Sequence, residues 1–148
     1  MIRPDSASVP HVVLHVLDDV GISDAVNADY PTPALSSITR RGVSFSHLYV
    51  QPVCSPTRAA LLTARYPFRQ GLQHAIPALS TAALPDEEST LADRFREGGY
   101  HTIFLGKWHL GYARWRDTPI GRGFDRAIGF FQGEEDYISK KFCSPIEC

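Results

Sequence analysis

The ten-residue stretch Cys54–Thr63, CSPTRAALLT, is the most informative part of the chain. It predicts a helix that begins near Pro56, because a proline is tolerated in the first helical turn, where the N–H group that it lacks would have no partner. The free N–H groups and the dipole of such a helix favour negative charge at Cys54. Arg58 follows one turn later and can reach the same position with its guanidinium. A cysteine beside a helix is most often a packed side chain, so this geometry alone leaves packing and chemistry both open.

The pentapeptide Cys54–Arg58 resembles the sulfatase signature, Cys-x-Pro-(Ser/Thr)-Arg. The resemblance extends upstream to the acidic pair Asp18-Asp19 and downstream to GKWHLG at 106–111, which is similar to a second sulfatase signature. Three shorter stretches resemble the arylsulfatase B branch, which is N-acetylgalactosamine-4-sulfatase-like. They are GLQH at 71–74, RGFD at 122–125 and EDY at 135–137.

The resemblance implies a specific chemistry at Cys54. In sulfatases this cysteine is oxidised after translation to formylglycine, so a formylglycine-generating enzyme is an expected maturation partner. The hydrated aldehyde would attack the sulfur of a sulfate ester with one hydroxyl and expel sulfate with the other. One calcium ion would activate it, bound by Asp18, Asp19 and an oxygen of the residue at position 54. The expected substrate is a sulfated carbohydrate or an aryl sulfate.

The same resemblance implies roles for three further residues. Arg58 would hold the formylglycine and stabilise charge around the metal, and Lys107 would bind a sulfate oxygen as a point charge. His109 would bind substrate and orient or deprotonate the diol. Outside the motif a lysine or histidine of this kind would be a solvated or structural residue. The expected catalytic set is therefore Cys54, Arg58, Lys107 and His109.

The hydrophobic pattern predicts strands that alternate with helices, which is typical of an α/β sandwich on a parallel sheet. The acidic pair, Cys54 and Lys107 each follow a predicted strand, and the carboxyl ends of such strands border the binding crevice. One site at that edge of the sheet is therefore expected, and residues 112–148 are expected to form loops. The predicted strands are 12–17, 43–50 and 100–105, and the predicted helices are 34–41, 56–64 and 89–97.

By resemblance the fold is the alkaline-phosphatase-like sulfatase fold, of which this chain is the amino-terminal portion. Residues 1–9 are expected to form a short leader and residues 10–148 an incomplete catalytic domain. Sulfatases complete the calcium shell with a downstream Asp-Asn pair and add a second histidine and lysine, whereas Asn27 is the only asparagine here. An alternative is an inactive, truncated remnant that acts at most as a binding protein. A weaker alternative keeps Cys54 as a thiol in a phosphatase-like relative.

Composition narrows the range of partners. The 148 residues are 43% hydrophobic, enough for one ordinary core. The 15 basic and 16 acidic residues give a net charge of −1, which does not favour nucleic acid or a polybasic membrane surface. No apolar run approaches the ~20 residues of a membrane span.

The amino-terminal residues lack the apolar core of a secretory signal peptide. The resemblance nevertheless implies the secretory pathway, with a lysosomal or extracellular destination. Cys143 and Cys148 form a candidate disulfide, which suits an oxidising compartment, although a partner beyond Cys148 is equally compatible.

Overall fold

The computed structural model describes residues 9–21, 23–24, 31–136 and 138–141. Contacts divide the chain into two compact units, residues 1–47 and 48–148. In the first unit, helix α2 spans Pro33–Arg41, with its proline in the first turn. The helix predicted at 34–41 is therefore confirmed. Gly42 follows the helix with an extended backbone, at φ −118° and ψ −159°.

The strands predicted at 12–17 and 43–50 are wrong. Both segments lie outside regular secondary structure, and Val13 and Val43 are 87% and 82% exposed. A strand exists only through hydrogen bonds to a neighbouring strand, and in the described part of the chain only two later strands pair with each other. The apolar pattern therefore identified segments with the composition of a strand, but it could not show whether a neighbouring strand pairs with them. The acidic pair Asp18-Asp19 forms a turn after the first of these segments, with Asp19 at φ +54°.

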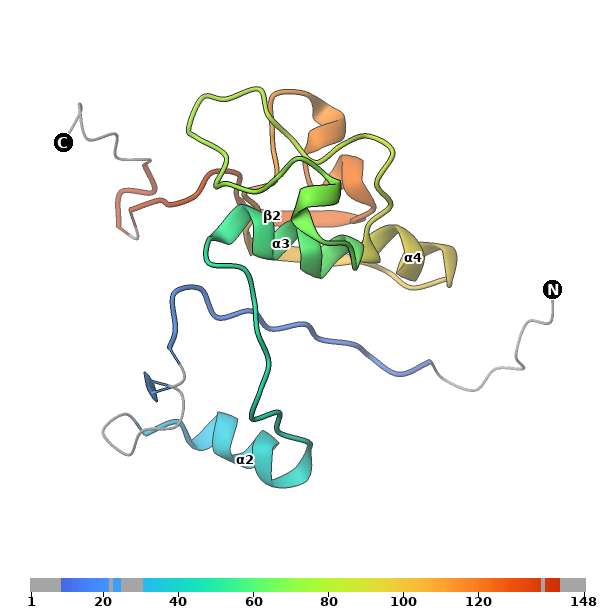
Figure 1. Cartoon of the computed structure of the whole chain (residues 1–148). Helices are drawn as coiled ribbons and strands as arrows, with labels where there is room; N and C mark the ends of the chain where they lie inside the picture. Colours follow the sequence, from blue (N-terminus) through green and yellow to red (C-terminus); the bar gives the residue numbers. More distant parts are fainter. Residues whose placement is uncertain (1–8, 22, 25–30, 137, 142–148) are drawn as a thin grey trace. The chain divides into compact units, whose positions relative to one another are not determined.

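The second unit contains two strands and the helices that follow α2 in the chain (Figure 1). Its strands β1 (Ile103–Lys107) and β2 (Arg126–Phe130) pair in parallel, with Ile103 opposite Arg126 and Lys107 opposite Phe130. A Cβ added at Gly129 would lie 1.9 Å from the carbonyl oxygen of Gly106, so a glycine is required where the two strands approach. The elements in chain order are α3 (Cys54–Thr63), η1 (Pro67–Arg69), α4 (Leu91–Glu97), β1 (Ile103–Lys107), η2 (Trp115–Asp117), η3 (Ile120–Arg122) and β2 (Arg126–Phe130).

The predicted helices at 56–64 and 89–97 correspond to α3 and α4, and the predicted strand at 100–105 corresponds to β1. The prediction that residues 112–148 are loops is wrong for β2. The sequence does not predict this strand, because its apolar run is short and is interrupted by Arg126 and Gly129. The segment forms a strand because it pairs with β1, which composition does not indicate. The observed class is mixed α/β with a small parallel sheet.

The core of the second unit is built around Trp108, which is 1% exposed. Phe104 and Phe124 meet its ring edge-to-face, with centroids 5.3 and 6.2 Å away. The indole N–H of Trp108 donates to the carbonyls of Gly111 (3.0 Å) and Asp117 (2.9 Å). Aromatic packing and a satisfied polar group together make this a strongly determined position. The buried apolar cluster comprises Ala59, Leu72, Ile76, Leu84, Trp108 and Leu110.

Helix α4 begins with a reciprocal cap that also joins it to the core. The Thr90 hydroxyl accepts from the N–H of Asp93 (3.2 Å), while the Asp93 carboxylate accepts from the N–H of Thr90 (2.9 Å). The same hydroxyl donates to the carbonyl of Arg122 at 2.7 Å, and Thr90 is 1% exposed. One buried hydroxyl therefore stabilises both the helix start and a turn distant in sequence.

A second polar contact closes the start of the sheet. The N–H of Thr102, just before β1, donates to the Asp125 carboxylate at 2.8 Å, just before β2. In return the N–H of Asp125 donates to the carbonyl of Thr102 at 2.9 Å. The Thr102 hydrogen bond, above all from its backbone N–H, holds the pKa of Asp125 below its ordinary value.

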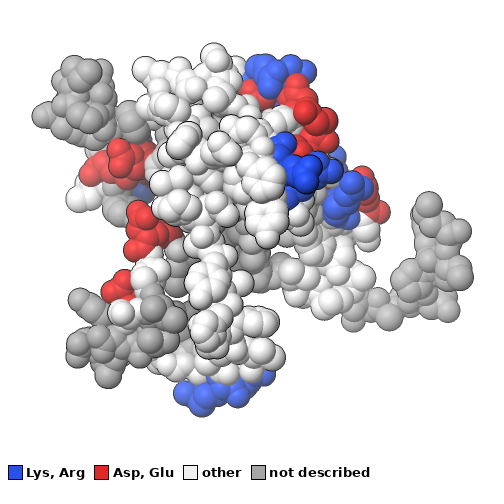
Figure 2. Space-filling model, in the orientation of Figure 1, with Lys and Arg blue, Asp and Glu red and all other residues white. Residues whose placement is uncertain are grey.

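Charged side chains of both signs lie next to each other on part of the surface. Blue and red atoms lie next to each other on the right of the face in Figure 2. One such group joins Asp86 to Arg114 and Arg116, each at 3.1 Å. No helix in the described part of the chain is long and apolar enough to cross a membrane.

We predict that Thr90→Val destabilises the protein by about 1–3 kcal/mol. The substitution keeps the shape of the side chain but leaves the N–H of Asp93 and the carbonyl of Arg122 without their buried partner. Urea unfolding measures the difference. Thr81→Val, at an exposed position in the same unit, is the control and should change stability by less than about 0.5 kcal/mol. Equal effects of the two substitutions would contradict the assigned role of Thr90.

We predict that Asp125 contributes to acid unfolding. Its folded pKa lies below the unfolded value of about 3.9, so its contribution is present above about pH 4 and is lost as pH falls through the folded pKa. Asp125→Asn should therefore lower stability at neutral pH and flatten its decline below pH 4. Thermal unfolding of the wild type and of Asp125→Asn between about pH 2 and pH 7 tests this prediction. An equal dependence of stability on pH in the two proteins would contradict the prediction.

Candidate functional site

Cys54 is the first residue of α3, in the position that the sequence predicts. Val53 before it is extended, with φ −137° and ψ 163°, so the chain turns into the helix at Cys54. The Thr57 hydroxyl donates back to the carbonyl of Val53 at 2.9 Å, which reinforces this first turn. The Cys54 thiol is half-buried and is not in a disulfide. It therefore lies where the helix start presents N–H groups.

His109 contacts the thiol directly. Its Nδ1 lies 3.0 Å from the Sγ of Cys54, although 55 residues separate the two in sequence. His109 is only 6% exposed, and its backbone is left-handed, with φ +56°. For a residue with a Cβ this conformation is sparsely populated, and it persists where the surroundings determine it. The strained turn directs the ring toward α3.

Arg58 and Lys107 connect α3 to the end of β1. An Nη of Arg58 donates to the carbonyl of Lys107, the last residue of the strand. Two residues later the N–H of His109 donates to the carbonyl of Phe131 at 3.0 Å, which continues the pairing beyond β2. The helix that carries Cys54 and the strand end that carries His109 are thus held together by a cation-to-backbone hydrogen bond.

The structure therefore brings together Cys54, Arg58, Lys107 and His109 within the second unit. Asp18 and Asp19 belong to the first unit. Their carboxylates are the oxygen donors that calcium prefers, and they are exposed at a turn. Among the described residues no three His, Cys, Asp or Glu side chains gather into a metal cluster. The donor type fits calcium, and two carboxylates supply only part of a shell of six to eight oxygens. Cys143 and Cys148 lie outside the described residues.

Sequence reasoning missed three contributors to this site. The carbonyl of Ile76 contacts Nε2 of His109 at 2.9 Å, and the Ser55 hydroxyl accepts from the N–H of Ile76 at 3.0 Å. A Cβ added at Gly133 would lie 2.7 Å from Cε1 of His109. A backbone carbonyl carries no sequence signal. Ser55 occupies the variable position of the pentapeptide, so the motif did not identify it either.

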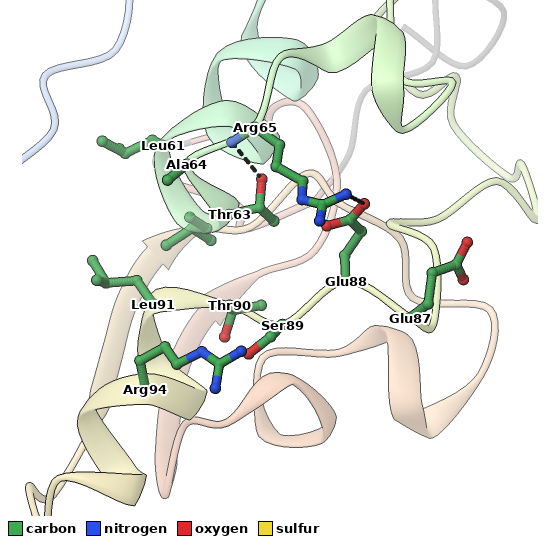
Figure 3. Close-up of a pocket in the computed structure, with 11 residues that line it drawn as sticks. Leu61, Thr63, Ala64, Arg65, Glu87, Glu88, Ser89, Thr90, Leu91 and Arg94 are labelled. Carbon is green, nitrogen blue, oxygen red and sulfur yellow. Dashed lines mark hydrogen bonds and ion pairs between the residues drawn. The ribbon is translucent and has the colours of Figure 1, made fainter.

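A separate pocket of about 350 Å³ lies at the other end of α3, between its last turn and the start of α4 (Figure 3). Arg65 crosses it to pair with Glu88 at 3.4 Å. None of the predicted catalytic residues lines it. Its lining consists of Leu61–Arg65, Glu87–Leu91 and Arg94.

Comparison with known proteins identifies the family. Residues 10–148 match the family model described as Sulfatase. The chain belongs to the sulfatase family. It is 37% identical to Arylsulfatase J of Mus musculus over 99% of this chain and 26% of that protein. It is 35% identical to Arylsulfatase of Klebsiella aerogenes over 88% of this chain and 30% of that protein.

A solved structure has a similar fold over most of the chain. The crystal structure of Ps i-CgsB in complex with k-i-k-neocarrahexaose superposes with a TM-score of 0.69 at 38% identity. The match covers 72% of this chain and 24% of the solved one. This sulfatase chain therefore spans about a quarter of the length of the relatives that it matches.

Proposed function

We propose that this chain is the nucleophile-bearing part of a sulfuric ester hydrolase of the arylsulfatase type. The observation that carries the proposal is the 3.0 Å contact between Cys54 at the start of α3 and His109. A nucleophilic centre and a base within hydrogen-bond distance, with the base oriented by a third group, are the parts that covalent catalysis requires. Membership of the sulfatase family indicates that the reaction is hydrolysis of a sulfate ester.

Conversion of Cys54 to formylglycine is the first element of the proposal. The Sγ of Cys54 stands where the aldehyde-derived oxygen would be attached. When present, formylglycine hydrate supplies two hydroxyl groups, one to attack the sulfate ester and one to release sulfate. The chain itself holds position 54 at the helix start and keeps Nδ1 of His109 within hydrogen-bond distance. Arg58 fixes α3 to the strand end that carries Lys107, whose ammonium would bind a sulfate oxygen.

Calcium is the second element. Asp18 and Asp19 would provide carboxylate oxygens to one ion, and the residue at position 54 would provide another oxygen. Two adjacent carboxylates repel each other, and a hard divalent cation removes that repulsion. The ion would polarise the attacking hydroxyl and the sulfate oxygens.

The substrate class and the branch are finer parts of the proposal. The solved relative is in complex with k-i-k-neocarrahexaose, which supports a sulfated carbohydrate as the substrate of this chain. The stretches at 71–74, 122–125 and 135–137 support the arylsulfatase B branch and, with it, an alkaline-phosphatase-like sandwich. A formylglycine-generating enzyme is the proposed maturation partner, and the secretory pathway is the proposed location.

We predict that co-expression with a formylglycine-generating enzyme converts Cys54 to the aldehyde. Mass spectrometry of the Cys54 peptide should reveal replacement of the CH₂SH group by CHO, and the modified peptide should react with a hydrazide probe. Arg58→Ala, within the recognised pentapeptide, should lower the converted fraction at least tenfold, and Arg69→Ala, at an exposed position outside it, should not. An unmodified thiol in every preparation would contradict the sulfatase proposal.

We predict that Asp18 and Asp19 bind calcium together. The two carboxylates are most of the calcium ligands proposed for this chain. Removing one of them by Asp18→Ala should therefore weaken calcium binding about tenfold or more. Isothermal titration with calcium measures the affinity. Glu87→Ala, an exposed carboxylate in the second unit, is the control and should leave it unchanged. Equal affinity in wild type and Asp18→Ala would contradict the metal assignment.

A further inference from the structure

The ring of His109 is held on three sides, by Cys54 of the proposed catalytic set and by Ile76 and Gly133 outside it. Nδ1 faces the Sγ of Cys54 at 3.0 Å, and Nε2 faces the carbonyl oxygen of Ile76 at 2.9 Å. On the Cε1 side, Gly133 leaves no room for a Cβ, which would lie 2.7 Å away. The ring is buried, so these contacts decide which nitrogen carries the proton.

The contact with Ile76 assigns the tautomer. A carbonyl oxygen only accepts hydrogen bonds, so the nitrogen that faces it must be the donor. A neutral imidazole has one N–H group, and here it is on Nε2. The lone pair is therefore on Nδ1, which faces position 54. This is the tautomer in which His109 can accept a proton from a nucleophile there.

Ser55 holds the carbonyl of Ile76 in place. Its hydroxyl accepts from the N–H of Ile76 at 3.0 Å, and Ser55 is fully buried beside Cys54 at the start of α3. Contacts thus form a closed circuit from Cys54 to its neighbour Ser55, through Ile76 to His109 and back to Cys54. The residue next to the nucleophile controls the orientation of the base.

We propose that Ser55 and the carbonyl of Ile76 are positioning groups that keep His109 in its Nε2–H tautomer, so that Nδ1 acts as the base for the nucleophile at position 54. The proposal deepens the proposed function and rests on it for the role of His109 in catalysis. In the proton transfer, the O–H bond of the hydroxyl at position 54 breaks and its proton moves to Nδ1. The resulting imidazolium still donates through Nε2 to Ile76, so the carbonyl dipole stabilises the new positive charge.

The test uses the full chain with Cys54 as its unmodified thiol. Long-range ¹H–¹⁵N spectra of histidine-labelled protein, at a pH where the imidazole is neutral, distinguish protonated from unprotonated ring nitrogens. The signals that disappear in His109→Gln assign the residue. We expect Nε2 protonated and Nδ1 unprotonated in the wild type. An Nδ1–H tautomer in the wild type would overturn the proposal without any further variant.

Two variants test the circuit from different sides. Ser55→Ala removes the acceptor for Ile76 and should lower the ratio of the Nε2–H to the Nδ1–H tautomer about three- to tenfold. Gly133→Ala displaces the ring directly and should change the same ratio. Both should slow alkylation of Cys54 by iodoacetamide, because the lone pair of Nδ1 then faces Sγ less often. Ser55→Thr retains the hydroxyl and should restore the wild-type ratio.

Ser89→Ala, in the pocket between the last turn of α3 and the start of α4, is the control and should change neither the tautomer ratio nor the alkylation rate. An unchanged tautomer ratio in Ser55→Ala, in protein with wild-type circular dichroism, would overturn the positioning role. Failure of the proposed function gives a different result: Cys54 would remain unmodified by the formylglycine-generating enzyme while His109 kept its Nε2–H tautomer.

Discussion

The burial of Trp108 is the constraint on which the candidate site depends. Its indole is 1% exposed and its N–H is bonded to two backbone carbonyls, so the ring has one way to fit the core. Lys107 and His109 are its neighbours in sequence, so the fixed position of Trp108 also limits where these two residues can lie. The left-handed backbone of His109 follows from this placement, because the chain must turn sharply between the buried Trp108 and the buried Leu110.

Some residues in the stretches that resemble sulfatases stabilise the fold rather than take part in the proposed chemistry. In the RGFD stretch, Arg122 is 5% exposed and donates to the carbonyls of Leu84 and Pro85. Asp125 in the same stretch closes the start of the sheet through Thr102. Both side chains bond to backbone groups, and the buried charge of Arg122 requires such bonds. The stretch therefore stabilises the scaffold that holds His109 against α3.

Local sequence signals predicted the helices α2, α3 and α4, strand β1 and the proximity of Cys54 to the stretch 106–111, but not which strands pair. Pro56 and Thr90 mark helix starts through the chemistry of their own residues, so α3 and α4 could be placed. Strand pairing depends on distant partners. The apolar segment 12–17 therefore remained unpaired, whereas β2 formed despite Arg126 and Gly129. The carbonyl of Ile76 could not be predicted at all, since every residue has one and only the fold selects it.

The second unit supplies groups that hold His109 beside position 54. The groups that fix His109 come from Ser55, Ile76 and Gly133, all within residues 48–148, whereas Asp18 and Asp19 belong to residues 1–47. Preorganised hydrogen-bonding groups stabilise charge because they need no rearrangement when it develops. The orientation of His109 is thus a consequence of packing within the second unit, whereas the proposed metal binding would depend on carboxylates of the first unit.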